Sequence, residues 1–346
     1  MNIDIDKKYV ISTMEKLINT MSPVGYYEEC EPLLEEILSE FGLKPFYDNR
    51  HSAYVRIKGK NSDKTVCIGA HMDTLGLVVH HIEKDGSMKV KNLGGNNFNS
   101  LEHEKMYLVT LEGKKYTGYL TCVSHSVHVF EDAKTLERDE KTMRFLLDED
   151  VHSYEDVVKL GIRHGDVIAA EPHFEYLENG RIRSRFIDDK AAVAACLGAI
   201  KYIVENKIVP EYDTLFSFPY YEELGFGASY VLDEIDEYIG IDIGVIGPEH
   251  SATERDVAIV SKDRQGPYDR AVTKKIVKCA QAIDIPYSVE VFNRYSTDSM
   301  AAFVGGNDIA AGAFGMTVYT SHGVERTFDT SIFNTAKLIV SYVTTK

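Results

Sequence analysis

The chain of 346 residues exceeds the usual size of a single hydrophobic core, so two domains are expected. It has 44% hydrophobic and 27% charged residues and no low-complexity tract, which predicts folding throughout its length. The formal net charge of -16 argues against nucleic acids and anionic membranes as partners, because both repel an acidic surface. A soluble small molecule or a peptide fits this charge better.

The cysteines indicate a reducing compartment. They are odd in number, widely spaced and without a CxxC pair, as expected of buried free thiols. They are Cys30, Cys67, Cys122, Cys196 and Cys279. The first residues lack a long apolar segment, and no run of about 18 apolar residues follows. We therefore predict a cytoplasmic protein.

The first part of the chain alternates helical and extended patterns. Apolar residues at helical spacing predict helices at 8–20 and 26–42. Strands are expected at 52–59 and 65–74, the second as an apolar run typical of a sheet covered on both faces. His71 therefore lies just beyond a buried strand.

The next hundred residues differ in character. Short alternating segments separated by Gly, Asn or charged turns predict a small β-rich module at 76–176. One helix is expected within it at 153–161, after a Ser cap. The α/β pattern of residues 1–75 resumes at 177–346, so the module interrupts an α/β domain.

The final part of the chain supplies further alternating elements. The Ala-rich segment 188–206 and the segment 271–286 predict helices. Apolar runs at 214–221 and 238–247 predict strands.

Five candidate metal ligands lie at the ends of apolar strands or at the turns after them. They are His71, Asp188, Glu223, Asp242 and His322. In open α/β sheets such positions converge beyond the carboxyl ends of the strands. Imidazole and carboxylate together suit zinc, cobalt or manganese. Acidic side chains directly after apolar strands would carry a desolvation cost unless a cation compensates them.

The ordered motifs GAHMDTLG, FIDDKAA, EELGFGA, IGID, STDS and TSHGVERT resemble those of the tetrahedral (TET) aminopeptidases, metallopeptidase family forty-two. The resemblance covers nearly the whole chain. It implies a mixed-sheet, three-layer dinuclear metallopeptidase domain interrupted by a small β-rich dimerisation domain. It also implies homo-oligomers, from dimers to a hollow tetrahedral dodecamer.

The resemblance implies two divalent metal ions per subunit and assigns their ligands. Asp188 would bridge both ions. His71 and Asp242 would complete one site, and Glu223 and His322 the other.

The same resemblance gives catalytic roles to two further acids. Glu222 matches the general base, and Asp73 matches the acid that orients the imidazole of His71. A water bridging two divalent ions has its pKa lowered toward neutrality, so Glu222 accepts one proton and returns it to the leaving amine. Holding the free α-amine of a peptide near the site would restrict cleavage to the first residue. The expected activity is removal of N-terminal residues from peptides.

The chain departs from the family pattern near the proposed pocket. Lys190 stands where the family often has Arg, and Ala192 where it often has Gly. Asp242 is followed by IGVIGPEHS in place of a Val-Thr type of sequence. These differences concern the substrate pocket more than the metal ligands.

Other histidines are interpreted as structural or exposed. His80 and His81 alternate on a strand and are left out of the ligand set. His125 and His128 are expected on one side of a strand, where a structural or interface role is favoured over a local metal site.

Four arginines could place a cation near an acidic first residue, although surface charge or a structural ion pair explains each more simply. They are Arg255, Arg264, Arg270 and Arg294. Asp298 and Ser299 are given a supporting role near the site.

Alternative functions remain open at this point. A related dinuclear-metal amidohydrolase or deacylase would act on a narrow small-molecule or dipeptide substrate. A non-catalytic assembly protein would retain the scaffold, but the intact Glu222 argues against it. A glycoside hydrolase would use the carboxylates but has no use for the histidines. Exposed strand edges expected in the module at 76–176 favour association between subunits.

Overall fold

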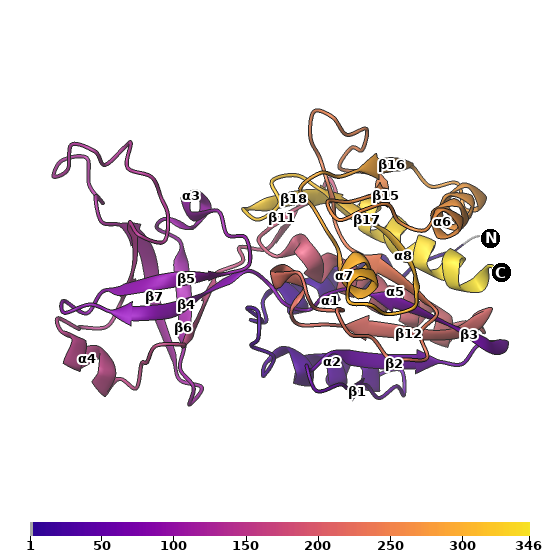
Figure 1. Ribbon diagram of the computed structural model, residues 1–346, viewed down its shortest axis with the longest axis horizontal. Helices are drawn as coiled ribbons and strands as arrows, with labels where there is room; N and C mark the ends of the chain where they lie inside the picture. The colour runs from indigo at the N-terminus through magenta and orange to yellow at the C-terminus, as the bar shows by residue number, and fades with distance from the viewer. Residues whose placement is uncertain (1–2) are drawn as a thin grey trace. The chain divides into compact units, whose positions relative to one another are not determined.

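The computed structural model describes residues 3–346 and divides into two compact units (Figure 1). One unit consists of the residues up to Asp73 together with His173–Lys346, and the other of Thr74–Pro172. Within the described residues, no helix has both the length and the apolar character needed to cross a membrane.

The first unit is built on a nine-stranded mixed sheet in the order β1-β2-β12-β3-β13-β17-β15-β16, with β14 pairing to β17. Its strands are β1 (Phe46–Tyr47), β2 (Ala53–Ile57), β3 (Asn61–Gly69), β12 (Tyr212–Phe218), β13 (Glu237–Ile241), β14 (Gly244–Val245), β15 (Val257–Lys262), β16 (Tyr287–Val291) and β17 (Ala310–Val318). The four neighbours β12, β3, β13 and β17 run parallel to one another. Strand β2 is antiparallel to β12, and β15 is antiparallel to β17. The predicted mixed-sheet α/β fold is confirmed.

Apolar residues alternate between the two faces of this sheet. Val66 and Ile68 of β3 join the larger core, which also contains the buried faces of five helices. Cys67, between them, joins a smaller core on the opposite face with Ala302 of a short helix. Since successive strand residues point to opposite faces, the sheet is the middle of three layers.

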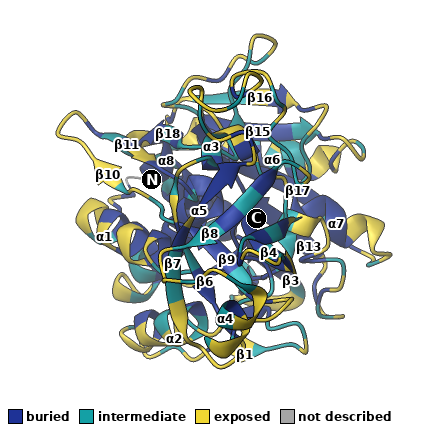
Figure 2. Ribbon diagram, turned by 90° about the vertical axis from the view of Figure 1, so that its left-hand side faces the viewer, coloured by how far each residue is buried: buried dark blue, intermediate teal, exposed yellow. Residues whose placement is uncertain are grey.

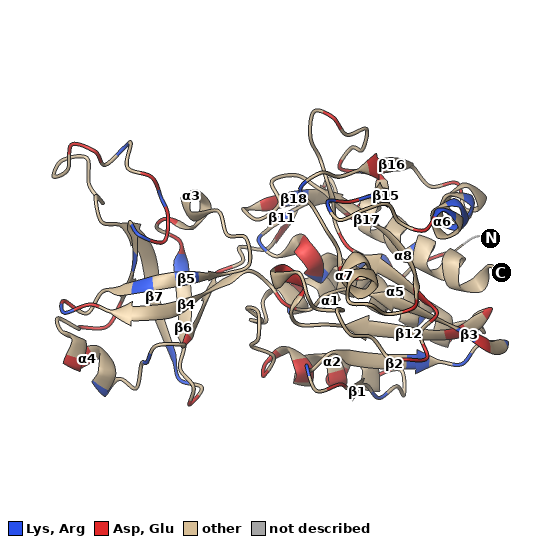
Figure 3. Cartoon of the chain, viewed as in Figure 1, with Lys and Arg blue, Asp and Glu red and all other residues tan. Residues whose placement is uncertain are grey.

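The helices of this unit cover the sheet. They are α1 (Lys7–Ile18), α2 (Cys30–Ser39), α5 (Ile187–Glu205), α6 (Arg270–Ala282), α7 (Asp298–Val304) and α8 (Asp329–Thr344). The central helix α5 is buried along most of its length, which explains its Ala-rich sequence, whereas α1 exposes an outer face (Figure 2). Acidic residues occur in both units, and α6 is basic (Figure 3).

Two small elements complete the first unit. A three-stranded sheet contains β10 (Glu175–Tyr176), β11 (Arg181–Ser184) and β18 (Glu325–Phe328). A short 3-10 helix, η1 (Glu222–Leu224), follows β12.

The second unit is a closed antiparallel barrel in the order β4-β5-β8-β7-β6-β9. Its elements are β4 (Gly76–Ile82), β5 (Met88–Leu93), α3 (Phe98–Leu101), β6 (Lys105–Val109), β7 (Lys115–Cys122), β8 (Met143–Leu147), α4 (Tyr154–Lys159) and β9 (Val167–Ala170). The expectation of exposed strand edges is wrong, because each of these strands pairs with a neighbour on both sides and closure removes the edges.

The predicted strand carrying His125 and His128 is also wrong. Strand β7 ends at Cys122, and the residues that follow form turns. Val127 and Val129 are exposed, so this segment buries no apolar face that could hold it in the barrel. The ring of His125 packs edge-on against Phe130, with the ring centroids 5.2 Å apart.

Candidate metal centre

Three neighbouring parallel strands bring the candidate site together. Strands β12, β3 and β13 lie side by side and run in the same direction, so their carboxyl ends meet at one edge of the sheet. His71 follows β3, Glu222 and Glu223 form η1 after β12, and Asp242 follows β13. This placement accounts for the convergence of residues far apart in sequence.

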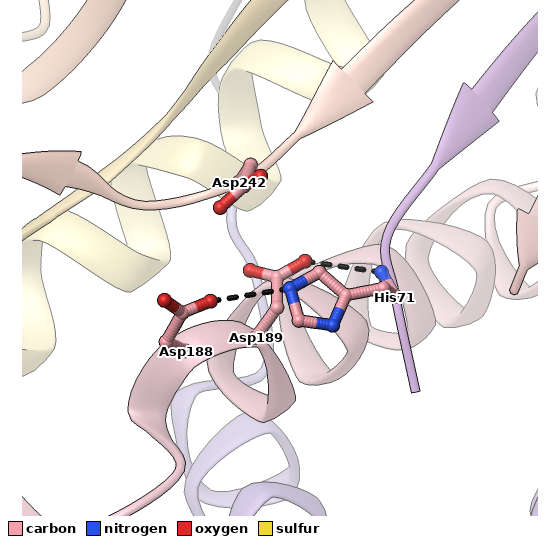
Figure 4. A group of neighbouring side chains, drawn as sticks. All are labelled: His71, Asp188, Asp189 and Asp242. Carbon is pink, nitrogen blue, oxygen red and sulfur yellow. Dashed lines mark hydrogen bonds and ion pairs between the residues drawn. The ribbon is translucent and has the colours of Figure 1, made fainter. Parts of the chain in front are cut away.

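The first group of potential ligands surrounds His71 (Figure 4). It contains His71, Asp188, Asp189 and Asp242, all buried, with one ligand atom from each within 4.8 Å of the others. The Nε2 atom of His71 lies 3.2 Å from Oδ1 of Asp188. The backbone N–H of His71 donates to Oδ2 of Asp189 at 3.1 Å. The other Asp189 oxygen is buried and has no hydrogen-bond partner among the described residues.

The second group shares Asp188 with the first. It consists of Asp188, Glu223 and His322, whose ligand atoms meet the same 4.8 Å limit. Nε2 of His322 lies 3.7 Å from Oδ2 of Asp188 and 3.6 Å from Oε2 of Glu223. The two oxygens of Asp188 therefore face different histidines, since its Oδ1 faces His71.

Asp73 fixes the backbone of the turn η1. Its Oδ1 accepts from the N–H of Glu222 and its Oδ2 from the N–H of Glu223, both at 3.1 Å. Nδ1 of His71 lies 3.0 Å from the Asp73 carbonyl oxygen and 3.5 Å from its Oδ1. Asp73 therefore touches both the imidazole and the turn that carries the two glutamates.

The buried carboxylate of Glu325 supports the second group. One of its oxygens accepts from the backbone N–H of Asp188 at 3.0 Å, and the other from the N–H of His322 at 3.1 Å. Glu325 thus links the backbones of two candidate ligands that are far apart in sequence.

The electrostatics of the cluster favour bound cations. Burial, reinforced by Asp188, raises the pKa of both Asp242 and Glu223 well above its usual range. Burial also raises the pKa of Glu222, and Asp242 adds to this effect. These shifts have one physical cause, which is the crowding of carboxylates in a desolvated site.

The shared acid behaves differently from its neighbours. Burial acts to raise the pKa of Asp188, but the hydrogen bond from His71 and the charges of His71 and His322 together outweigh it, and the pKa is lowered. Burial acts to lower the pKa of His71, yet Glu222 and Asp188 raise it. Among the described residues, His71 is the group that most offsets the mutual repulsion of these carboxylates. Divalent cations fit it, because mixed imidazole and carboxylate donors suit such ions and would neutralise the excess charge.

The structure brings together all five candidate ligands and places Glu222 and Asp73 beside them. Sequence reasoning missed Asp189 and Glu325, which stand in the motifs FIDDKAA and TSHGVERT but are not singled out there. The signal for Asp189 was its position next to Asp188. The signal for Glu325 was a charge three residues after His322 that begins a strand.

The residues discussed as pocket candidates lie outside the two ligand groups. The guanidinium of Arg255 stacks on the ring of Phe328, 3.5 Å from its centroid. Lys190 is buried and donates to Sγ of Cys30 at 3.1 Å. Arg255 and the other three arginines, Arg264, Arg270 and Arg294, are all exposed.

Solved structures share this fold along nearly the whole chain. The TET aminopeptidase of Thaumarchaeota archaeon SCGC AB-539-E09 matches with a TM-score of 0.87 at 18% identity, covering 97% of this chain and 96% of that one. The TET1 peptidase of Pyrococcus horikoshii, which can assemble into a tetrahedron or a large octahedral shell, matches with a TM-score of 0.84 at 21% identity over 96% and 99% of the two chains. The chain therefore has the mixed-sheet α/β fold of these peptidase structures.

Sequence comparison identifies the family. The model of the M42 glutamyl aminopeptidase family matches residues 52–338. The chain is 36% identical over 338 residues to YhfE of Bacillus subtilis (strain 168), covering 96% of this chain and 98% of YhfE. It is 28% identical over 236 residues to the lysyl aminopeptidase of Pyrococcus furiosus, covering 67% and 65% of the two chains. The chain therefore belongs to the M42 aminopeptidase family.

Proposed function

We propose that this protein is a dinuclear metal-dependent aminopeptidase that removes residues one at a time from the N-terminus of peptides. The observation that carries the proposal is the position of Asp188, which belongs to both groups of potential ligands. In this proposal Asp188 would serve two divalent ions at once. His71 and Asp242 would complete one site, and Glu223 and His322 the other. Asp189 lies close enough to the first site to serve as an additional ligand.

Zinc, cobalt or manganese ions bound there would lower the pKa of a water molecule and polarise the scissile carbonyl. Proton transfer would be carried out by a side chain of the protein. Oε2 of Glu222 lies 3.6 Å from Nε2 of His71, so this carboxylate faces the ligands without belonging to either group. Glu222 is therefore assigned as the general base that takes a proton from the attacking water and returns it to the leaving amine.

Asp73 is assigned a positioning role. Its hydrogen bonds to both N–H groups of the turn would fix the positions of the base Glu222 and the ligand Glu223 relative to each other. Its contact with the His71 ring would orient that imidazole as well.

We further propose that the protein works in the cytoplasm as a homo-oligomer, from a dimer to a tetrahedral dodecamer. Five free cysteines, all buried, support a reducing compartment. Leu111, Val127 and Val129 in the barrel unit are 76%, 57% and 68% exposed, and such residues are suited to a subunit interface. The assembly of the Pyrococcus horikoshii TET1 peptidase into closed shells supports the same proposal.

One panel of assays tests the catalytic proposal. The purified protein would be stripped of metal, refilled with zinc, cobalt or manganese, and given aminoacyl-arylamides, N-blocked peptides and carboxymethylcellulose. We expect metal-dependent cleavage of the aminoacyl-arylamides alone. Cleavage of N-blocked substrates would favour an amidohydrolase or deacylase, and no cleavage with any metal would favour a non-catalytic role.

A further inference from the structure

The hydroxyl group of Tyr295 points inward without a partner. Tyr295 lies on the loop between β16 and α7, and the residue as a whole is only partly buried. Its hydroxyl oxygen, by contrast, is buried and makes no hydrogen bond with any described residue. Tyrosines at a surface usually present the hydroxyl to water or to a partner, so this arrangement needs an explanation.

A neighbouring tyrosine, Tyr268, has a buried hydroxyl that is fully hydrogen-bonded. The hydroxyl of Tyr268 donates to Oδ2 of Asp263 at 3.0 Å and lies 2.8 Å from the hydroxyl of Thr297. Tyr295 comes two residues before Thr297 yet has no such partner. A purely structural role would be expected to resemble that of Tyr268.

The loop of Tyr295 is anchored to the strand that leads to Asp242. The hydroxyl of Ser299, near the start of α7, donates to the carbonyl oxygen of Tyr238 at 2.8 Å. A Cβ atom at Gly240 would lie only 3.3 Å from the hydroxyl oxygen of Thr297, so strand and loop pack closely here. Asp242 follows Gly240 by two residues.

The same loop is anchored to the segment after Glu222. Oδ1 of Asp298 accepts from the N–H of Ala228 at 2.8 Å. The chain around Tyr295 thus contacts both the segment that carries Asp242 and the segment that follows Glu222.

The tyrosine ring is held firmly in this position. It packs edge-on against Phe292, with centroids 5.0 Å apart, and Phe292 packs edge-on against His250 at 4.9 Å. The backbone carbonyl of Tyr295 accepts from the N–H of Arg264 at 2.9 Å. A donor on a fixed ring is preorganised for a ligand.

The charged groups near the hydroxyl belong to the candidate metal centre. Burial raises the pKa of Tyr295, and Asp242, Tyr268, Asp188 and Glu222 raise it further. These three carboxylates can accept but not donate when ionised, whereas a tyrosine is protonated at neutral pH. Tyr295 therefore adds a hydrogen-bond donor to a site made mainly of acceptors.

We propose that the Tyr295 hydroxyl donates a hydrogen bond to the scissile carbonyl oxygen of the bound peptide and stabilises the negative charge that develops there. The phenolic proton stays on Tyr295 throughout. This proposal rests on the proposed aminopeptidase function, and it makes Tyr295 a catalytic residue in addition to Glu222.

The test compares Tyr295→Phe with the control Tyr287→Phe, which removes a hydroxyl that accepts from the Gln281 side chain at the surface. On an aminoacyl-arylamide, Y295F should lower kcat about a hundred-fold or more, as expected for loss of one such donor. KM, Tm and metal content should stay at the wild-type values, and Y287F should match wild type throughout. An unchanged kcat in Y295F, or loss of metal from it, would overturn the proposal.

A binding measurement separates this proposal from the function on which it rests. Calorimetry on the metal-loaded proteins would use the phosphonic acid analogue of leucine, whose tetrahedral anionic group mimics the tetrahedral intermediate with its charged oxygen. The comparison ligand is leucinol, which has the same side chain and amine but no carbonyl. Y295F should weaken phosphonate binding at least ten-fold and leave leucinol binding unchanged. Equal phosphonate affinity in both proteins would overturn the role of Tyr295 even if the wild type proved to be an active aminopeptidase. A wild type without activity would defeat the proposed function and, with it, the role of Tyr295, which rests on that function.

A second variant covers the case in which Y295F is unstable. Incorporation of 3,5-difluorotyrosine at position 295 keeps the ring and hydroxyl but lowers the pKa of the phenol. The alkaline fall in kcat should then begin at lower pH, while Tm stays unchanged. An alkaline limb identical to that of the wild type would count against donation by this hydroxyl.

Discussion

The carboxylate of Asp73 accepts a hydrogen bond at 3.1 Å from the backbone N–H of Glu223, a residue 150 positions further along the chain. The second Asp73 oxygen holds the N–H of Glu222 in the same way. The turn that presents the proposed base and a proposed ligand therefore depends on one buried side chain.

Replacing Asp73 with Ala should lower kcat about 10- to 100-fold, because the turn loses both acceptors and the His71 ring loses a neighbour. Two partly buried N–H groups left without these partners should also lower Tm. Asp73→Asn, which keeps one acceptor, should fall between Asp73→Ala and the wild type. Steady-state kinetics and thermal unfolding check this, and wild-type kinetics for Asp73→Ala would exclude a positioning role.

Replacing Glu222 with Gln should leave metal content and Tm nearly unchanged while kcat falls by about three orders of magnitude or more. The substitution removes a group proposed to act as both base and acid, each worth roughly 10²–10⁴-fold. Glu234→Gln, at an exposed position paired with Arg56, is the matched control and should keep full activity. A Glu222→Gln enzyme with a tenth of wild-type activity would show that another group takes the proton.

Replacing Asp188 with Ala should remove both metal ions, because both groups of ligands depend on it. His71→Ala and His322→Ala should each weaken mainly one site, since each histidine belongs to only one group. Elemental analysis after dialysis against a defined metal concentration gives the occupancy. Two ions at full occupancy in Asp188→Ala would rule out the bridging assignment.

Asp298 should make the metal-free protein less stable as the pH rises. Burial raises its pKa to about 7 in the folded protein, against about 3.9 in an unfolded chain. Between these values the folded state holds more protons than the unfolded state, so the free energy of unfolding falls with rising pH. Asp298→Asn keeps the acceptor for Ala228 but cannot titrate.

Urea unfolding of the metal-free proteins from pH 4 to pH 8 measures this effect. The stability of Asp298→Asn relative to the wild type should increase up to about pH 7 and then level off, as set by the two pKa values. A difference between the two proteins that does not vary with pH would contradict the assignment.

Light scattering of the metal-loaded protein should report a dimer or a larger even-numbered oligomer. Val129→Asp places a charge on an exposed apolar position of the barrel unit and should shift the population toward smaller species. Chelation of the metal should also release dimers. A wild-type protein that remains monomeric at micromolar concentration would defeat the proposed assembly.

Periodicity and strand-end residues were sufficient to predict the α/β class and to select candidate ligands, because both depend on local sequence patterns. The closure of the barrel could not be predicted, since it depends on pairings such as β4 with β9, which are distant in sequence. The partners of Asp73 and the inward hydroxyl of Tyr295 also escaped prediction. They depend on loops brought together only by tertiary packing.

The central position of β17 (Ala310–Val318) has a consequence for synthesis on the ribosome. Strand β13 pairs with β3 on one side and with β17 on the other. The interior of the sheet is therefore incomplete until residues 310–318 are available. The barrel strands all lie between Gly76 and Ala170 and can close much earlier. While β17 and His322 have not yet emerged, a nascent chain can close the barrel but cannot complete the large sheet or the second group of candidate ligands.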